Sequence, residues 1–174
     1  MLNYRYNLKA LFDLLEQGGE LDSFIGDIFR FNLICDENYG VKEILFDEHV
    51  AKESKSEYFN KISEVLRTES FKQFVLQLID NNDLHFYELI SRKFVDLIGQ
   101  EKNSSFVEVI SAIDLSAGQQ DTIKQEIERL LQKKVYLYNT VSKNIIGGFI
   151  LKFGEKMLDL SIQANLEELK MALV

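Results

Sequence analysis

The hydrophobic pattern of this 174-residue chain changes its period once, close to residue 105, and that change limits the folds open to it. Before this point apolar residues recur at steps of three and four, which is the spacing of one helix face. After it, stretches such as 106–112 alternate and are rich in β-branched residues, which is typical of strands. A chain that places helices first and strands later is expected to be an α+β protein with two parts.

The first part, residues 1–105, carries six apolar stripes at helical spacing. Gly18 and Gly19 are expected to end the first helix, because glycine readily adopts the left-handed conformation found at helix ends. The connections between stripes are mostly short, which predicts an antiparallel six-helix bundle. The stripes occupy residues 4–15, 21–28, 41–46, 59–66, 71–79 and 86–98.

The second part, residues 106–174, is predicted to be a small α+β domain with the order strand, helix, two or three strands, helix. Ser116 and Gln119 have the spacing of a capping box at a helix start. Gly154-Glu155 separates the apolar stretches 149–153 and 157–160, which indicates a β-hairpin. The polar segment 99–105 is either a linker or the frayed end of the helix before it.

The charge of the chain is negative and unevenly divided. Lys and Arg number 20 against 28 Asp and Glu, a net charge of −8, and residues 1–105 hold 12 of the cations and 19 of the anions. This balance argues against nucleic-acid binding, which needs clustered cations. The acidic helical part either forms a solvated surface or receives a basic or amphipathic partner.

No residue pattern in the chain points to catalysis, to a metal or to a cofactor. Cys35 is the only cysteine, so it cannot form an internal disulfide, and its apolar neighbours indicate a buried thiol. His49 and His85 cannot build a Cys/His zinc site, and neither lies beside a nucleophile motif. The amino terminus lacks the profile of a targeting sequence, and no apolar run approaches the roughly 20 residues that span a bilayer, so no direct membrane insertion is expected.

The glycine pair at 147–148 has two interpretations. A small enzyme could use such a pair to hold a phosphate, but a strand follows here, and the usual Lys and Ser or Thr are missing. The alternative is a bulge, or a close backbone approach that leaves no room for a side chain.

Residues 145–162 and the leucines that follow them resemble the signature of the delta subunit of F-type ATP synthase, the counterpart of the mitochondrial oligomycin-sensitivity-conferring protein. The family pattern is Ile-Gly-Gly, a short apolar strand, Gly-Asp-x-x-x-Asp-x-Ser, then Leu-x-x-Leu. The first helix departs from the family's Tyr-Ala-x-Ala-Leu, since this chain has Asn-Leu-Lys-Ala-Leu at 7–11. The residues in register are Gly147, Gly148, Gly154, Asp159, Ser161, Leu166 and Leu169.

The resemblance implies a stator subunit without an active site, which couples proton flow to ATP synthesis. Residues 1–105 would hold the amino-terminal helices of the alpha subunits, and residues 106–174 would meet the b subunits. The location would be peripheral, on the cytoplasmic face of a bacterial inner membrane or the stromal face of a thylakoid. An unrelated two-domain adaptor or another peripheral-stalk subunit is the alternative. The expected walls of the helix-binding groove are Leu8, Leu11, Phe74 and Leu78.

Overall fold

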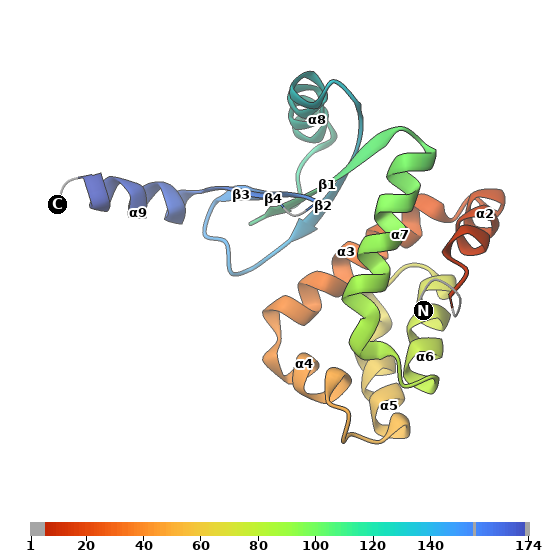
Figure 1. Ribbon diagram of the computed structural model, residues 1–174. Helices are drawn as coiled ribbons and strands as arrows, with labels where there is room; N and C mark the ends of the chain where they lie inside the picture. Colours follow the sequence, from red (N-terminus) through yellow and green to blue (C-terminus); the bar gives the residue numbers. More distant parts are fainter. Residues whose placement is uncertain (1–5, 155, 173–174) are drawn as a thin grey trace. The chain divides into compact units, whose positions relative to one another are not determined.

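A computed structural model of the chain describes residues 6–154 and 156–172 and divides into two compact units, residues 1–98 and 99–174. Helices make up the first unit, while the second contains a four-stranded sheet with helices (Figure 1). The predicted α+β class is confirmed. The structure divides after residue 98, whereas the sequence suggested a division after residue 105. Tyr4, the expected start of the first stripe, lies outside the described residues.

The helices of the first unit begin and end largely where local signals predict. Asn7 caps the first of them, its side-chain oxygen accepting a hydrogen bond from the Ala10 N–H at 3.1 Å. Gly19 ends that helix in the left-handed conformation, with φ of 69°. Among the described residues of this unit the helices are α2 (Leu8–Gly18), α3 (Leu21–Glu37), α4 (Tyr39–Phe46), α5 (Lys52–Ile62), α6 (Glu69–Asp80) and α7 (Tyr87–Glu101), with short 3₁₀ turns η1 (Ser63–Val65) and η2 (Leu84–Phe86).

The expected helix at 59–66 was misplaced, because α5 covers Lys52–Ile62 and Leu66 is extended. The apolar face of α5 is narrow and consists largely of Phe59 and the buried Lys55, which lie four residues apart on one face. A lysine can bury its aliphatic stem while its ammonium group reaches water. A pattern that counts Lys55 as charged therefore misses the first half of this helix.

The core of the first unit is an aromatic cluster centred on Phe24, which has no exposed surface. Its ring packs edge-on against Phe71 and Phe94, with centroids 5.2 and 5.6 Å away. Phe31 repeats this arrangement with Tyr87 at 5.0 Å. Edge-to-face pairs of this kind add to the stabilisation from burial alone, and they hold α3, α6 and α7 together.

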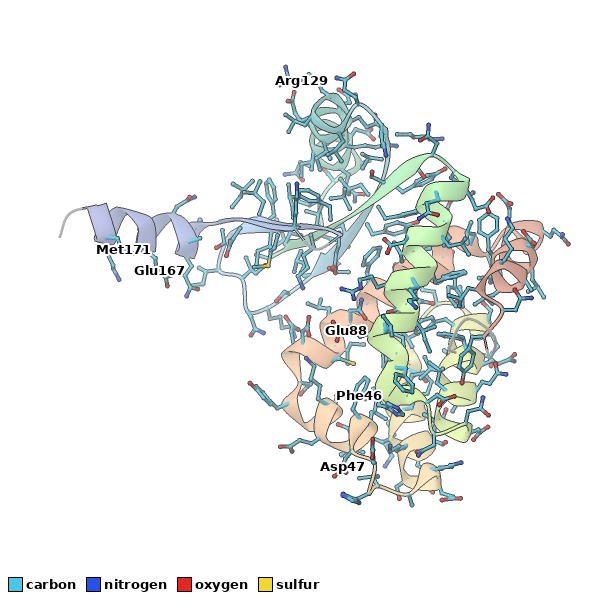
Figure 2. The ribbon with its side chains drawn as sticks, in the orientation of Figure 1. Phe46, Asp47, Glu88, Arg129, Glu167 and Met171 are labelled. Carbon is cyan, nitrogen blue, oxygen red and sulfur yellow. The ribbon has the colours of Figure 1, made fainter. Side chains whose placement is uncertain are left out.

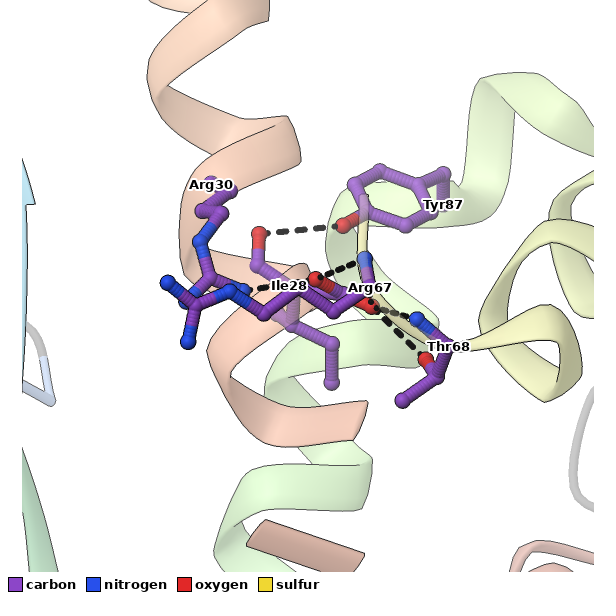
Figure 3. A network of polar contacts seen from close by, with 6 residues as sticks. Ile28, Arg30, Arg67, Thr68 and Tyr87 are labelled. Atoms are coloured by element: carbon purple, nitrogen blue, oxygen red, sulfur yellow. Dashed lines mark hydrogen bonds and ion pairs between the residues drawn. The ribbon is translucent and has the colours of Figure 1, made fainter. Parts of the chain in front are cut away.

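A buried carboxylate, Asp27 of α3, ties α3 to the start of α6 (Figure 3). It accepts hydrogen bonds from the backbone N–H of Thr68 at 2.7 Å and of Arg67 at 3.0 Å, and from the Thr68 hydroxyl at 2.7 Å. Arg30, one turn further along α3, pairs with the same carboxylate at 2.7 Å. Asp27 is fully buried, so these donors replace the water that its charge would otherwise require.

The sheet of the second unit has the strand order β2-β1-β3-β4. β1 (Ser104–Ser111) pairs in parallel with β2 (Lys134–Val141), and antiparallel with β3 (Gly148–Phe153). β3 and β4 (Lys156–Ser161) form the predicted hairpin, and β4 is an edge strand. α8 (Ala117–Leu131) connects β1 to β2, and α9 (Ile162–Ala172) follows β4.

α8 covers one face of this sheet and completes its small core. Ser116 and Gln119 form the predicted capping box at its start. Ile127 of α8 packs on Val107, Val109, Val135 and Leu151, which all lie on that face. The core is therefore concentrated between α8 and the strands nearest to it.

We expect Asp27→Asn to lower the free energy of unfolding by about 3 kcal/mol, because the amide would leave buried donors and Arg30 without their charged acceptor. Urea denaturation followed by circular dichroism measures the effect. The control is Asp22→Asn, an exposed position on the same helix, which should change stability by less than about 0.5 kcal/mol. Equal effects of the two substitutions would contradict this account.

Candidate functional site

The signature glycines Gly147 and Gly148 lie at the start of β3, which pairs with the end of β4. Gly148 has φ of 78°, and a side chain there would overlap the carbonyl oxygen of Leu160 and lie 2.9 Å from the Cα of Ser161. A side chain on Gly147 would come within 2.6 Å of Ile162. Only glycine fits either position without movement of its neighbours. The close-approach interpretation therefore explains the pair.

Asp159 and Ser161 complete this junction and fix the start of α9. The Ser161 hydroxyl oxygen accepts a hydrogen bond from the Ala164 N–H at 3.2 Å, which is the bond of a helix N-cap. Asp159 accepts one from the Ser161 N–H at 2.9 Å, and the Ile162 N–H donates to the Gly147 carbonyl at 3.0 Å. The signature therefore sets the point at which α9 leaves the sheet.

Gly154 lies in the turn between β3 and β4 with φ of 58°, and among the described residues other than its chain neighbours no atom lies within 4 Å of the place a Cβ would take. Its role in the hairpin is thus conformational alone. Leu166 lies on α9 and is about half exposed, at 54%. Leu169 also lies within α9, but its side chain falls outside the described part of the structure.

Large apolar side chains are exposed along β4 and α9. α9 runs out from the end of β4 (Figure 1), and Met171 and Glu167 project from it with no other element of the unit beside them (Figure 2). Exposed apolar side chains often mark a protein-binding surface, and here Leu158 and Leu160 lie on one face of β4 while Met157 lies on the other. The residues are Met157, Leu158, Leu160, Ile162, Leu166 and Met171, with exposures between 39% and 74%.

The four residues expected to line a groove in the helical unit differ in their burial. Leu8 and Leu11 of α2 are half-buried, Phe74 of α6 is 8% exposed, and Leu78 is fully buried. Leu78 therefore belongs to the core beneath the surface, where no partner could touch it without a shift of the helices. Phe74 lies at the edge of the aromatic cluster, 5.9 Å from Phe24.

Tyr6 anchors the segment before α2 to the turn that follows α6. Its hydroxyl donates to the Asp83 carboxylate at 2.8 Å and accepts from the side-chain amide of Asn81 at 3.2 Å. Tyr6 and Asp83 are both buried. These contacts join parts of the chain that are more than 70 residues apart, and they bring the start of α2 to the end of α6.

The polar side chains of the described residues do not converge on a reactive centre. His49 and His85 are exposed, and within residues 6–154 and 156–172 no three His, Cys, Asp or Glu side chains gather as metal ligands would. Burial raises the pKa of the Cys35 thiol from 9.0 to about 12, with a smaller effect in the same direction from Asp36. The thiol is thus a buried, unreactive group, as its apolar neighbours predicted. None of the described helices has the length and apolar character needed to cross a bilayer.

The sequence pattern did not identify the exposed apolar surface of β4. Met157, Leu158 and Leu160 were assigned to a strand, but their exposure depends on the edge position of that strand. The available signal was the run Met-Leu-Asp-Leu, which places apolar residues on both faces of one short strand. Asp27 was likewise missed, because its partners lie 40 residues away.

Comparisons with known proteins agree in length and order with this architecture. A family model described as ATP synthase delta (OSCP) subunit matches residues 3–173. "ATP synthase subunit delta" of Rickettsia africae is 31% identical over 153 residues, which are 87% of this chain and 83% of that protein. The Rickettsia peacockii protein of the same name is 30% identical over 165 residues, or 94% and 90%.

A solved structure has the same fold. A chain in the cryo-EM structure of the Toxoplasma gondii mitochondrial ATP synthase hexamer aligns with a TM-score of 0.57 and 16% identity. The alignment covers 99% of this chain and 97% of that chain. Both units of the present chain are therefore found, in the same order, in that structure.

We expect Gly148→Ala to destabilise the second unit by at least about 2 kcal/mol, because it adds a backbone clash to the cost of a positive φ. Gly154→Ala is the matched control, since it has the positive φ without the clash, and should cost about 1 kcal/mol. Hydrogen exchange of the β3 and β4 amides in the full chain localises the loss. Similar costs for the two variants would show that the approach of β4 to Gly148 is unimportant.

We expect the Cys35 thiol to react about 1,000-fold more slowly with a disulfide reagent in the native chain at pH 8 than in 6 M urea, since a rise of three pKa units lowers the thiolate fraction by that factor. Because the folded pKa exceeds the unfolded one, the contribution of this group to stability is complete below pH 9 and is lost as pH rises towards 12. Rates within tenfold of each other would contradict the burial.

Proposed function

The chain belongs to the ATP synthase delta (OSCP) subunit family and is a non-catalytic stator subunit of an F-type ATP synthase, and we propose that its two units bind different parts of that complex. The helical unit, an antiparallel six-helix bundle in this proposal, holds amino-terminal helices of the alpha subunits of the catalytic head. The sheet unit binds the b subunits of the peripheral stalk. The assignment of the sheet unit to the b subunits is supported mainly by the exposed apolar surface of β4 and α9.

The alpha-subunit site is proposed to lie on α2 and α6. Leu8 and Leu11 remain half-buried on α2, while Phe74 of α6 is 8% exposed and Leu78 lies in the core, so Leu8 and Leu11 would make the direct contacts and Phe74 and Leu78 would support them from below. An amphipathic helix would bury its apolar face against these side chains. Residues 1–105 hold 12 Lys and Arg against 19 Asp and Glu. This negative charge favours a partner helix that carries basic side chains.

Two separate contacts suit the mechanical role of a stator. Once one unit is bound, the other engages at a raised effective concentration, so two moderate affinities give a tight hold. The head is then prevented from turning with the rotor, and proton flow is converted into conformational change and ATP synthesis. The subunit is placed peripherally, on the cytoplasmic face of a bacterial inner membrane or the stromal face of a thylakoid, through its partners. An unrelated adaptor of like architecture would bind neither partner.

We expect the full chain to bind a peptide of the first two dozen or so residues of the same organism's alpha subunit with a Kd in the micromolar range or tighter. Leu11→Asp should weaken this binding by about 30-fold or more, as the loss of a central apolar contact does. Isothermal titration calorimetry measures both affinities.

The control is Ala10→Asp, which adds the same charge to an exposed position of α2 and should change the affinity less than about threefold. Equal loss in the two variants would show that charge, and not the proposed groove, governs binding. Absence of binding by the unmodified chain would overturn the alpha-subunit assignment.

A further inference from the structure

α2 is too short to stay helical without support from the rest of its unit. It has 11 residues, and isolated helices of this length are marginal in water. Its buried side chains are Phe12 and Leu15, in the middle and the second half of the helix. The first turn offers only the half-buried Leu8 beside the exposed Lys9 and Ala10. The position of this turn therefore depends on a contact from outside the helix.

The turn that follows α6 has a closely defined backbone. Asn82 adopts the left-handed conformation with φ of 58°, and its N–H donates to the Ile79 carbonyl at 2.9 Å. The N–H of Asp83 donates to the Leu78 carbonyl at 2.8 Å. These are the two bonds of a Schellman motif, which satisfies carbonyl groups at a helix end. The motif fixes the backbone of the residues on either side of Asn82, which are Asn81 and Asp83.

The hydroxyl of Tyr6 bonds the side chains of both these residues. It donates its one hydrogen to the Asp83 carboxylate at 2.8 Å and accepts from the Asn81 amide at 3.2 Å. Tyr6 is 8% exposed and Asp83 5%, and a hydrogen bond to a carboxylate is strong where water is largely excluded. We call these three residues, Tyr6, Asn81 and Asp83, the Tyr6 anchor.

The backbone connects the Tyr6 anchor directly to the first turn of α2. The Leu8 N–H donates to the Tyr6 carbonyl at 2.8 Å. Asn7, between them, caps the helix, because its side chain accepts from the Ala10 N–H and its carbonyl from the Leu11 N–H at 3.0 Å. The places of Leu8 and Leu11 are therefore set by the residue that bonds the end of α6.

We propose that Tyr6 is a positioning residue for the helix-binding site on α2, because its hydroxyl holds the first turn where Leu8 and Leu11 can contact a partner. The inference rests on the proposed function of the helical unit and adds to it the group that orders the site before a partner binds. When the anchor is open, the turn must be ordered on binding, and the apparent affinity falls with the fraction of molecules in which it is ordered. The family pattern has tyrosine where this chain has Asn7, so here the cap and the anchoring tyrosine are adjacent residues.

Removal of one hydroxyl tests the anchor and leaves the aromatic ring in place. In the full chain, Tyr6→Phe should speed hydrogen exchange of the Leu11 amide by about tenfold, because a bond to a buried carboxylate is lost. The matched control is Tyr87→Phe, since Tyr87 is 2% exposed and its hydroxyl donates to the Ile28 carbonyl at 3.4 Å. The control should change exchange of the same amide by less than about threefold. Thermal melts check that each variant is folded.

Binding tests whether the anchor orders the site. With the alpha-subunit peptide described above, Tyr6→Phe should weaken the affinity about fivefold, and Tyr87→Phe less than about twofold. Asn81→Ala, which removes the second partner of the Tyr6 hydroxyl, should weaken it about threefold. In the double variant Asn81→Ala should add nothing to Tyr6→Phe, because the hydroxyl that it bonds is already gone. A general loss of stability would instead give additive effects.

The possible outcomes separate the two proposals. If the unmodified chain does not bind the alpha peptide, the proposed function of the helical unit fails, and the positioning role of Tyr6 fails with it. If the peptide binds but Tyr6→Phe and Tyr87→Phe weaken it equally, or Tyr6→Phe leaves the affinity unchanged, only the role of Tyr6 is overturned. Unchanged exchange of the Leu11 amide in Tyr6→Phe would likewise show that the first turn of α2 is held by other contacts.

Discussion

The helical unit depends on the carboxylate of Asp27, which is fully buried and accepts hydrogen bonds from protein donors. It accepts hydrogen bonds from the backbone N–H groups of Arg67 and Thr68, so a side chain of α3 caps the start of α6. This contact fixes where α6 begins, and hence how Phe71 and Phe74 meet Phe24. The α6 side of the surface proposed for the alpha subunit is thus positioned by a buried polar contact with α3.

In the sheet unit the signature residues determine the path of the backbone and take no part in a reaction. Gly147 and Gly148 allow the end of β4 and the start of α9 to lie close to the backbone of β3. Asp159 and Ser161 accept hydrogen bonds from backbone N–H groups at the point where β4 ends and α9 begins. Apolar side chains on β4 and α9 are then left without a cover from their own unit. The residues that resemble the family pattern therefore set the geometry of the β4–α9 junction, and Leu166 is the one among those with described side chains that is itself part of the exposed apolar set.

Local signals in the sequence predicted local structure well. The capping box at Ser116, the hairpin around Gly154 and the helix end at Gly19 each depend on a few consecutive residues, and each was found. Properties that depend on distant partners could not be predicted. The burial of Leu78 and the exposure of Leu158 follow from which elements lie above them, and an apolar residue in a periodic stripe carries the same signal in either case.

The direct passage from β4 into α9 has a mechanical consequence. Ser161 is the last residue of the strand and Ile162 the first of the helix, so no flexible connection separates them. A pull on α9 along the direction of β4 therefore acts in shear on the β3–β4 ladder, in which six residue pairs share the force at once. Hydrogen bonds stretched together resist separation far better than bonds opened one after another. A subunit that must withstand the torque of a rotor would gain from force entering its sheet by this route.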